Sequence, residues 1–270
     1  EIGMGTPRES LRLQRDDQGA THLVVPKTGE DHTERMRAWS LQKIAALRVM
    51  GLSGYVLKAK SPSCGMERVK VYDGNGIPNK DGQGVFAEAL IAAFPQLPIE
   101  EEGRLNDPRL RESFFERVFA YTRLRRLFSS EWSPADLVAF HTREKLLLRA
   151  HDELGYQDLG RLVANLKAPR EQVATRYQEM FMSTLAKKMS RGRNVNVLHH
   201  MLGYLKRELS ADCKAEVLRH VEDYSAGHVP LLVPLTLLRH YVRLHDVRYL
   251  ATQSYLDPHP KELMLRTFIL

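Results

Sequence analysis

The segment best suited to chemistry is Lys60-Ser61-Pro62-Ser63-Cys64-Gly65, in which a cysteine stands between a hydroxyl residue and a glycine. It directly follows an apolar segment, residues 54–58, that predicts a short buried strand. Ligands in open α/β sheets bind beyond the carboxyl ends of the strands, so a cysteine here can react or bind a metal. Lys58 and Lys60 place positive charge beside a thiol whose ionised form is the nucleophile and the metal ligand. The alternative interpretation of a lone cysteine is a small residue packed against a turn.

Two further segments supply candidate partners for this loop. Gly82-Gln83-Gly84 opens an apolar stretch with helical spacing. A glycine-rich helix start presents unpaired backbone N–H groups and the positive end of the helix dipole, so Gly82 and Gly84 are candidate anion-binding residues. An ordinary turn is the alternative, because two glycines alone are weak evidence. Residues 100–102, three glutamates followed closely by Arg104, predict either a solvated turn or a structural ion pair.

The elements that position these residues alternate between strands and helices up to about Ser130. We predict strands at residues 21–25, 54–58 and 97–100, and helices at residues 33–50, 82–94 and 107–128. This alternation predicts a Rossmann-like α/β domain with a mostly parallel sheet covered on both faces. The first residues have the composition of a loop that follows a strand, so we expect this domain to be incomplete at its N-terminus.

Strand patterns give way to helical ones after Ser130. Ser133-Pro134 begins a helix with a cap residue followed by proline, and the helical pattern continues to about residue 154. Further helices are predicted at residues 170–189, 195–209, 211–226 and 234–245. We therefore predict an α/β domain over residues 1–129 and an all-α domain over residues 130–270.

Positive charge is concentrated in the predicted helical domain. The chain has a formal net charge of +7, and residues 141–207 hold 13 Lys or Arg against 6 Asp or Glu, which is the same excess. Concentrated positive charge is typical of proteins that bind nucleic acid, although a solvated surface is the alternative for any one basic run. The residues expected to contact RNA are Arg143, Lys145, Lys187, Lys188, Arg191, Arg193 and Lys206.

The histidines of this half do not match a familiar metal pattern. None of them forms the i, i+4 histidine pair with an acid that a helical zinc site usually shows. We expect them to be core or capping residues and assign them no metal. The histidines concerned are His141, His151, His199, His200 and His240.

Composition and cysteine content indicate where in the cell the protein is expected. Hydrophobic residues make up 43% of the chain, which is typical of a globular protein, and no apolar run approaches the roughly 18 residues of a membrane helix. The two cysteines, Cys64 and Cys213, fall in different predicted domains, so we expect neither to have a disulfide partner. These features favour a cytoplasmic protein with no membrane partner.

Several motifs, taken in order, resemble known families. The first half is similar to the thiouracil desulfidase (TudS-type) domain, and the second half resembles the YbgA-type domain. Fused in this order, the pair resembles bacterial desulfidases that remove 4-thiouridine from tRNA, over essentially all 270 residues. In the first half the resemblance is carried by Thr6-Pro-Arg8, Asp31-His-Thr33, the cysteine segment at residues 60–65, Tyr72-Asp-Gly74, Gly82-Gln-Gly-Val-Phe-Ala87 and Glu102-Gly-Arg-Leu105. In the second half it is carried by Phe140-His141, Lys145, His151, Leu159-Gly-Arg161, Asn196-Val-Leu-His199, Gly203-Tyr204, Pro230-Leu-Leu-Val-Pro-Leu-Thr236, His240-Tyr241 and Tyr255-Leu-Asp-Pro-His-Pro260.

This resemblance implies an iron–sulfur enzyme. Such domains hold a [4Fe–4S] cluster by three cysteines, and the open iron acts as a Lewis acid on the thiocarbonyl sulfur. Cys64 matches the third ligand, and the resemblance places Ser61 and Ser63 where a hydroxyl orients the substrate or a proton. Arg8 and Lys60, with Gly82 and Gly84, are the candidate residues for binding the substrate or an anion.

The chain departs from the family pattern in its cysteines. The two other cysteine ligands of the family are absent from this sequence, and Cys213 is not expected to replace them. We therefore expect this chain alone not to assemble the cluster, as a shortened form of an active enzyme or a relative that has lost the chemistry. Two other functions stay open. One is a non-catalytic RNA-binding protein, and the other is a cysteine hydrolase that uses Cys64 without a cluster.

Overall fold

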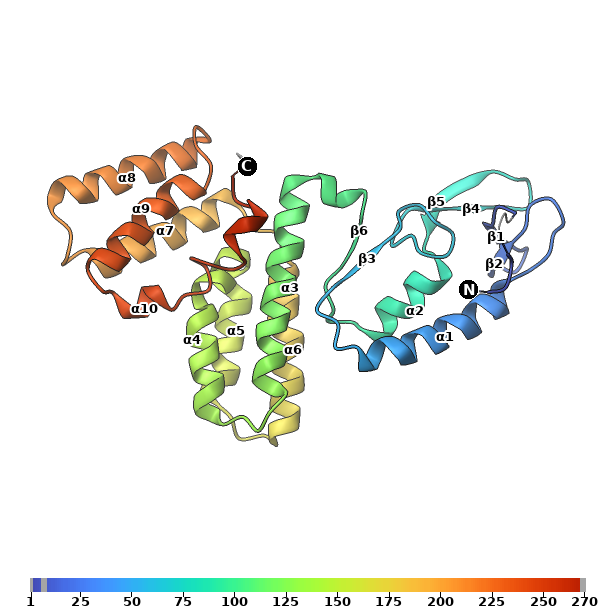
Figure 1. Ribbon diagram of the computed structural model, residues 1–270, viewed down its shortest axis with the longest axis horizontal. Helices are drawn as coiled ribbons and strands as arrows, with labels where there is room; N and C mark the ends of the chain where they lie inside the picture. The colour runs from blue at the N-terminus through green and yellow to red at the C-terminus, as the bar shows by residue number, and fades with distance from the viewer. Residues whose placement is uncertain (1, 6–8, 268–270) are drawn as a thin grey trace. The chain divides into compact units, whose positions relative to one another are not determined.

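A computed structural model describes residues 2–5 and 9–267, and its contacts divide the chain into two compact units (Figure 1). The units are Glu1–Asp107 and Pro108–Leu270. This division lies one helix earlier than the boundary predicted at residues 129 and 130. Helix α3 (Pro108–Phe128) follows the strands in the sequence, but it packs against α4 (Pro134–His151) and α6 (Arg170–Ala186) of the second unit.

The first unit is a small mixed α/β structure. Its strands are β1 (Arg12–Arg15), β2 (Thr21–Val24), β3 (Tyr55–Leu57), β4 (Val69–Tyr72), β5 (Pro78–Gly82) and β6 (Ile99–Glu101), and its helices are α1 (Thr33–Val49), α2 (Val85–Ala93) and the 3-10 turn η1 (Arg104–Asn106). Four strands form one sheet in the order β2-β1-β4-β5, and β3 pairs with β6 in a separate parallel ribbon. The strands and helices predicted in this half are thus present, with bounds shifted by a few residues.

The mostly parallel sheet that we predicted is not what the structure shows. Only β1 and β4 run parallel in the larger sheet, while β1 pairs with β2 and β4 pairs with β5 in antiparallel hairpins. Each hairpin is closed by an aspartate whose carboxylate accepts two backbone N–H groups across the turn, Asp16 in the first hairpin and Asp73 in the second. Connections this short permit antiparallel pairing only, because a parallel pair needs a crossover of a dozen or more residues.

The core of the first unit lies between the larger sheet and α1. Leu13, Leu23 and Val71 are at most 1% exposed, and Met36 of α1 packs against them. The ring of Trp39 on α1 lies 5.3 Å from the ring of Phe86 on α2, which joins the two helices. Because α2 is fixed in this way, its first turn has a defined position for the loop that precedes it.

The second unit is all helical, as predicted. Besides α3, α4 and α6 it contains α5 (Glu153–Ala164), α7 (Arg191–Leu205), α8 (Ala211–Ala226), α9 (Leu232–Leu244), α10 (Arg248–Ala251) and the 3-10 turn η2 (Lys261–Leu263). The predicted start at Ser133-Pro134 is confirmed, and Ser133 and Asp136 form a reciprocal capping box. The helix does not run on to residue 154, because Asp152 adopts an extended backbone and caps α5 through the Gly155 N–H.

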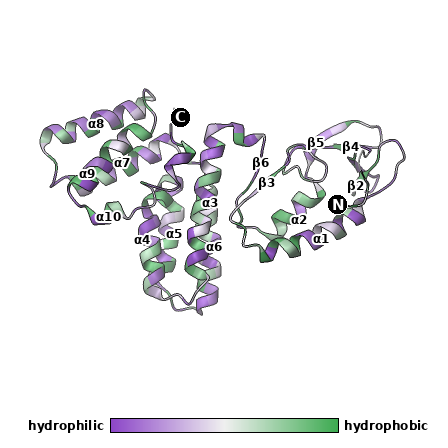
Figure 2. Cartoon of the chain, in the orientation of Figure 1, coloured by the Kyte–Doolittle hydropathy of each residue, from purple (hydrophilic) through white to green (hydrophobic). Residues whose placement is uncertain are grey.

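Aromatic and aliphatic side chains fill the helical core. Tyr177, Phe181 and Leu198 are completely buried, and Tyr224 is 1% exposed. Along these helices hydrophobic residues alternate with hydrophilic ones, as Figure 2 shows, which is the pattern of helices with one buried face. No helix in residues 2–5 and 9–267 is both long enough and apolar enough to cross a membrane.

Candidate functional site

The cysteine loop is a tight turn shaped by the Ser61 side chain. The Ser61 Oγ accepts hydrogen bonds from the backbone N–H groups of Ser63 and Cys64, both at 3.3 Å. The Ser61 carbonyl accepts the N–H of Gly65 at 2.8 Å. Lys60, at the entrance to the turn, has a left-handed backbone with φ of 58°. Ser61 therefore holds the backbone conformation that places the thiol.

Ser63 is the polar side chain next to the thiol. Its Oγ lies 3.5 Å from the Cys64 Sγ and 3.0 Å from the Ser61 Oγ. Both hydroxyls and the half-buried thiol thus lie in one chain of contacts within the loop. This arrangement leaves Ser63 able to donate to the cysteine sulfur or to a group bound beside it.

The start of α2 lies directly against the cysteine loop. The backbone N–H groups of residues 84–86 donate to the carbonyl oxygens of Gly65, Pro62 and Ser63 at 2.8, 3.2 and 2.8 Å. The N–H groups at the start of α2, on which the predicted anion site at Gly84 depends, are therefore already used within the protein, and Gly82 belongs to β5 instead. The two glycines permit close packing instead, because a Cβ on Gly84 would lie 2.6 Å from the Cys64 N, and one on Gly82 would overlap the side chain of Val71.

Glu101, the last residue of β6, and Glu102, which follows it, hold the cysteine loop from both sides. The Glu102 carboxylate accepts the Ala59 N–H at 2.6 Å just before the loop, and the Glu101 carboxylate accepts the Met66 N–H at 2.7 Å just after it. Lys58 lies 3.0 Å from Glu102, and its hydrogen bond holds the pKa of that carboxyl below its usual value. The positive charge of Lys58 is thus directed to Glu102.

The acidic run is a structural ion-pair cluster, the second of the two interpretations that its sequence left open. Glu100 and Glu101 are 4% and 6% exposed, and Arg104 donates to Glu100 at 2.6 Å and also pairs with Glu67. Sequence reasoning missed the clamps from Glu101 and Glu102 on the loop backbone, because their partners lie 35 and 43 residues away in the chain.

A basic hollow of about 780 Å³ opens beside the cysteine loop. Lys60 and Pro62 of the loop contribute to its lining, together with Glu67 and Glu101 and residues of β4 and β5. The guanidinium of Arg12 lies over the Tyr72 ring, 5.1 Å from its centre. Six cations against two carboxylates make the hollow suitable for a phosphate group. The six are Arg12, Lys60, Arg68, Lys70, Lys80 and Arg104.

Of the four residues predicted to bind substrate or anion, Lys60 alone lines this hollow among the residues that the structure describes. Arg8 lies outside the described residues. The other cations of the hollow were not singled out from the sequence. The signal that identifies them is the alternation of apolar and basic residues in Val69-Lys70-Val71, which puts Lys70 on the solvent face of β4.

Two of the residues predicted to contact RNA hold the second unit together. Lys187, which follows α6, pairs at 2.5 Å with Asp152, the residue between α4 and α5. Arg193, in the first turn of α7, donates to the carbonyl oxygens of His151 and Lys188 at 2.8 and 3.2 Å. Both side chains therefore make contacts within the protein, while the Lys187 side chain is still 55% exposed.

The other predicted RNA-binding residues differ in their surroundings. The Arg143 guanidinium lies 5.4 Å from the centre of the Phe140 ring, and Arg191 donates to the Ser225 carbonyl at 3.5 Å. The remaining three are the half-buried Lys145 and the exposed Lys188 and Lys206. Lys188 and Lys206 are consequently the members of the predicted set that are best placed for an external anion.

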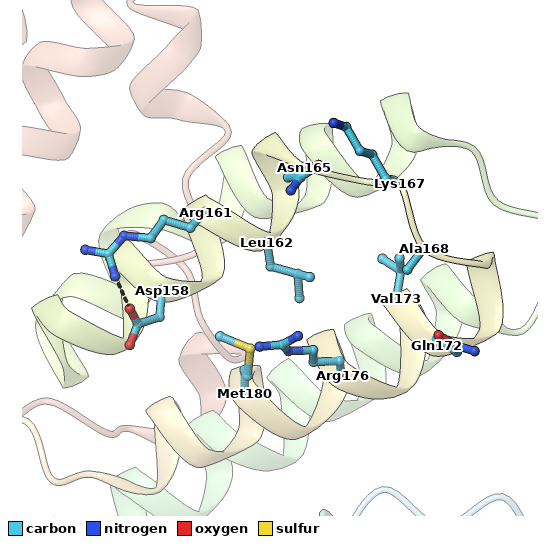
Figure 3. A pocket seen from close by; sticks show the side chains of 10 residues that line it. All are labelled: Asp158, Arg161, Leu162, Asn165, Lys167, Ala168, Gln172, Val173, Arg176 and Met180. Carbon is cyan, nitrogen blue, oxygen red and sulfur yellow. Dashed lines mark hydrogen bonds and ion pairs between the residues drawn. The ribbon is translucent and has the colours of Figure 1, made fainter.

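A second hollow, of about 670 Å³, lies between α5 and α6 (Figure 3). Arg161, Lys167 and Arg176 line it, and Arg161 pairs with Asp158 at 2.5 Å. None of the seven predicted RNA-binding residues belongs to this lining. It is a further positively charged surface of the second unit.

Comparison with known proteins separates the chain into the same two parts. Residues 1–102 match the family described as 2-thiouracil desulfurase, and residues 145–260 match a family described as a protein of unknown function, DUF1722. The chain carries a 2-thiouracil desulfurase domain followed by a DUF1722 domain. The cysteine loop, its two glutamate clamps and the start of α2 all lie within the desulfurase match.

One curated relative extends this comparison. The uncharacterized protein YbgA of Escherichia coli (strain K12) is 27% identical over 164 residues, which is 60% of this chain and 97% of YbgA. At this identity it is a distant homologue. No solved structure matches the chain significantly.

Proposed function

We propose that the chain removes sulfur from a thiolated uracil, most specifically from 4-thiouridine in tRNA. In the net reaction water replaces the ring sulfur, so that the thiocarbonyl becomes a carbonyl and sulfide leaves. The observation that carries the proposal is the cysteine loop of the desulfurase domain, with the Ser63 hydroxyl 3.5 Å from the Cys64 sulfur and a basic hollow beside it.

The serines have separate roles in this proposal. Ser61 accepts two backbone N–H groups and so holds the turn, which makes it a positioning residue. The Ser63 hydroxyl is the group that can orient a sulfur or hold a proton beside Cys64. The hollow, with its six cations, binds the phosphate next to the base and so positions the nucleotide.

The family resemblance also implies a [4Fe–4S] cluster, and the residues of this chain do not fit that group by themselves. A cluster held by three cysteines needs three thiolates near one another. The desulfurase domain contains one cysteine, Cys64, and the other cysteine of the chain, Cys213, belongs to the second unit. Cys64 can supply one ligand, and the remaining thiolates would have to come from outside these 270 residues.

RNA as the substrate carrier is supported by charge. The excess of 7 positive charges over residues 141–207 falls mostly within the DUF1722 match, and Lys188 and Lys206 are exposed there. A protein that neutralises phosphates with such side chains binds more weakly as salt rises. We propose that the helical unit holds the tRNA while the desulfurase domain takes the modified base.

The competing functions make different demands on Cys64. A cysteine hydrolase requires a base near the thiol, yet the described residues place no histidine in hydrogen-bond contact with the Cys64 Sγ. A non-catalytic RNA-binding protein makes no use of the thiol. One experiment can therefore distinguish both alternatives from desulfuration.

The test is anaerobic reconstitution of the complete gene product with iron and sulfide, followed by assay of sulfide release from tRNA that contains 4-thiouridine and from free thiouracil. We expect release by the wild type, none by Cys64→Ser, and a clear decrease in kcat for Ser63→Ala. Binding of tRNA should survive both changes. Full activity of Cys64→Ser would exclude both catalytic functions, and activity without iron would leave only the hydrolase.

A further inference from the structure

The helical unit buries a group of acids and histidines that the proposed desulfuration does not use. Glu112 and Glu116 lie one turn apart on α3 and are 7% and 1% exposed. His259 approaches them from the segment between α10 and η2. One nitrogen or oxygen atom from each of these three residues lies within 4.8 Å of the others.

The two histidines near these acids are oriented with a lone pair toward the interior. His151 Nδ1 lies 2.6 Å from the Lys187 carbonyl, and His259 Nδ1 lies 3.2 Å from the Pro260 carbonyl. A carbonyl oxygen only accepts, so each Nδ1 carries the proton and each Nε2 of a neutral ring has a free electron pair. Histidines that bind metals are held in this way, with the other ring N–H on a carbonyl or carboxylate.

Three acceptor atoms of this cluster face no hydrogen-bond donor among the described residues. His151 is completely buried, and its Nε2 lies 3.5 Å from the Glu116 Oε2. The Nε2 atoms of both histidines and the Glu116 Oε2 lack a hydrogen-bond partner among the described residues. A proton on His151 would satisfy that one contact and leave His259 unpartnered. A cation satisfies the acceptors together.

Arg266 fixes the two carboxylates without filling this place. It donates to the Oε1 atoms of Glu112 and Glu116 at 3.1 and 2.5 Å and to the Tyr255 carbonyl at 2.6 Å. Arg266 donates only to the Oε1 atoms, so the Glu116 Oε2 is left for a cation. Carboxylates that bind metals are hydrogen-bonded in this manner by a surrounding residue.

We propose that Glu112, Glu116 and His259 bind a divalent zinc ion, with His151 as a positioning residue beside Glu116. Imidazole nitrogen together with carboxylate oxygen is a donor set that zinc accepts. The ion would join α3 to the segment after α10 and so fasten the C-terminal segment to the helical unit. This site requires no histidine pair at helical spacing, which is why the sequence pattern did not indicate it.

The test is zinc binding by the purified full chain after treatment with a chelator, measured as metal retained on dialysis and as a change in Tm. The matched variants are His259→Gln in the cluster and His228→Gln, whose side chain is 74% exposed. We expect one zinc per chain for the wild type and for His228→Gln, and an affinity at least about tenfold weaker for His259→Gln. Zinc should raise the Tm of the first two proteins only.

Two controls keep the result specific. Cobalt in place of zinc gives a near-ultraviolet charge-transfer band if a thiolate is a ligand, so the absence of this band excludes Cys64 and Cys213. Glu112→Gln retains an acceptor for Arg266 and serves as a second variant if His259→Gln is unfolded by circular dichroism. Failure of the wild type to retain zinc, or equal retention by the wild type and a folded cluster variant, would overturn the proposal.

Discussion

Gly84 determines how closely the cysteine loop approaches α2. A Cβ there would lie 2.6 Å from both the Cys64 N and the Ser63 O, which are backbone atoms that cannot rotate away. We predict that Gly84→Ala lowers the free energy of unfolding by about 1–3 kcal/mol, the usual cost of overpacking. It should also change the rate at which Cys64 reacts with a thiol reagent, because the loop must move.

Gly103→Ala is the matched control for this substitution. Its Cβ would meet the Ala59 Cβ at 3.6 Å, an ordinary van der Waals distance in the same region of the first unit. Thermal unfolding and the rate of thiol labelling are measured for both variants. Equal behaviour of the two proteins would show that the close approach at Gly84 does not control the loop.

At the residue scale the sequence singled out the cysteine loop as a candidate site but did not indicate the residues that support it. Cys64, Ser61 and Ser63 were recognisable because cysteine and serine next to proline and glycine after a strand are unusual. Glu101 and Glu102 were not, since a glutamate that accepts a backbone N–H looks the same in sequence as one in water. The helix was predicted from Gly82, whereas α2 begins at Val85 after Gly84, and Gly82 ends β5. Whether the N–H groups at this helix start are free depends on a loop that packs on it.

At the scale of elements, Arg123 joins α3 to α4 and to the C-terminal segment. It donates from Nε and Nη2 to the two carboxylate oxygens of Glu144 at 2.7 and 2.8 Å, and from Nη1 to the Pro258 carbonyl at 3.0 Å. Glu144 is completely buried and also accepts the Ser254 hydroxyl. These contacts explain why α3 belongs to the second unit.

We predict that Arg123→Met destabilises the helical unit by up to about 3–5 kcal/mol, because the buried Glu144 carboxylate then keeps only the Ser254 hydroxyl and the longer Arg143 contact at 3.5 Å. Replacing both residues, as Arg123→Met with Glu144→Leu, should recover much of this loss. Denaturation by urea gives the comparison. A single variant as stable as the wild type would mean that the pair contributes nothing to the packing of α3.

The pH dependence of the helical unit should be set in part by His141 on α4. Burial, with a smaller contribution from the Lys145 charge, lowers the pKa of His141 to about 4. Its ring stacks on Tyr156, with centres 5.4 Å apart, and its Nδ1 lies 3.1 Å from the Tyr177 hydroxyl. The folded protein therefore favours the neutral imidazole.

The unfolded chain binds a proton at this histidine near its ordinary pKa of about 6.5, whereas the folded chain does so only near 4. Stability should thus be unaffected by His141 above about pH 6.5 and should fall as pH drops from there toward 4, by up to about 1.4 kcal/mol per pH unit. Thermal unfolding of His141→Gln between pH 7 and 5 should show a shallower decline than that of the wild type. The exposed His228→Gln variant should retain the full slope.

At the scale of elements, sequence patterns predicted where helices and strands lie but not how the strands pair. Residues 21–25 and 33–50 gave a strand and a helix with nearly correct bounds, because local periodicity sets them. The pairing of strands did not follow from periodicity, since β1 lies beside β4 in the sheet while β3 pairs with β6. The antiparallel hairpins depend on the Asp16 and Asp73 side chains, and the alternation of predicted strands and helices gives no information about these.

For the whole molecule, positive charge is the property on which the proposed RNA binding of the helical unit rests. The total excess of positive charge was predictable from the sequence, but which basic side chains can contact an external anion was not. Lys187 and Arg193 stood out in a basic run, yet the structure uses them to fasten α4, α6 and α7 to one another. The residues free for an external anion are fewer than the run suggests.

This distinction gives the last prediction. Lys188→Glu combined with Lys206→Glu should weaken tRNA binding and reduce the slope of log affinity against log salt by about one for each lysine, because both side chains are exposed. Lys43→Glu with Lys261→Glu changes the net charge equally at positions outside residues 141–207, and should leave the slope nearly unchanged. Filter binding across a salt series measures both. If the two double variants lose the same affinity, net charge alone governs binding, and the helical unit has no defined RNA surface at these lysines.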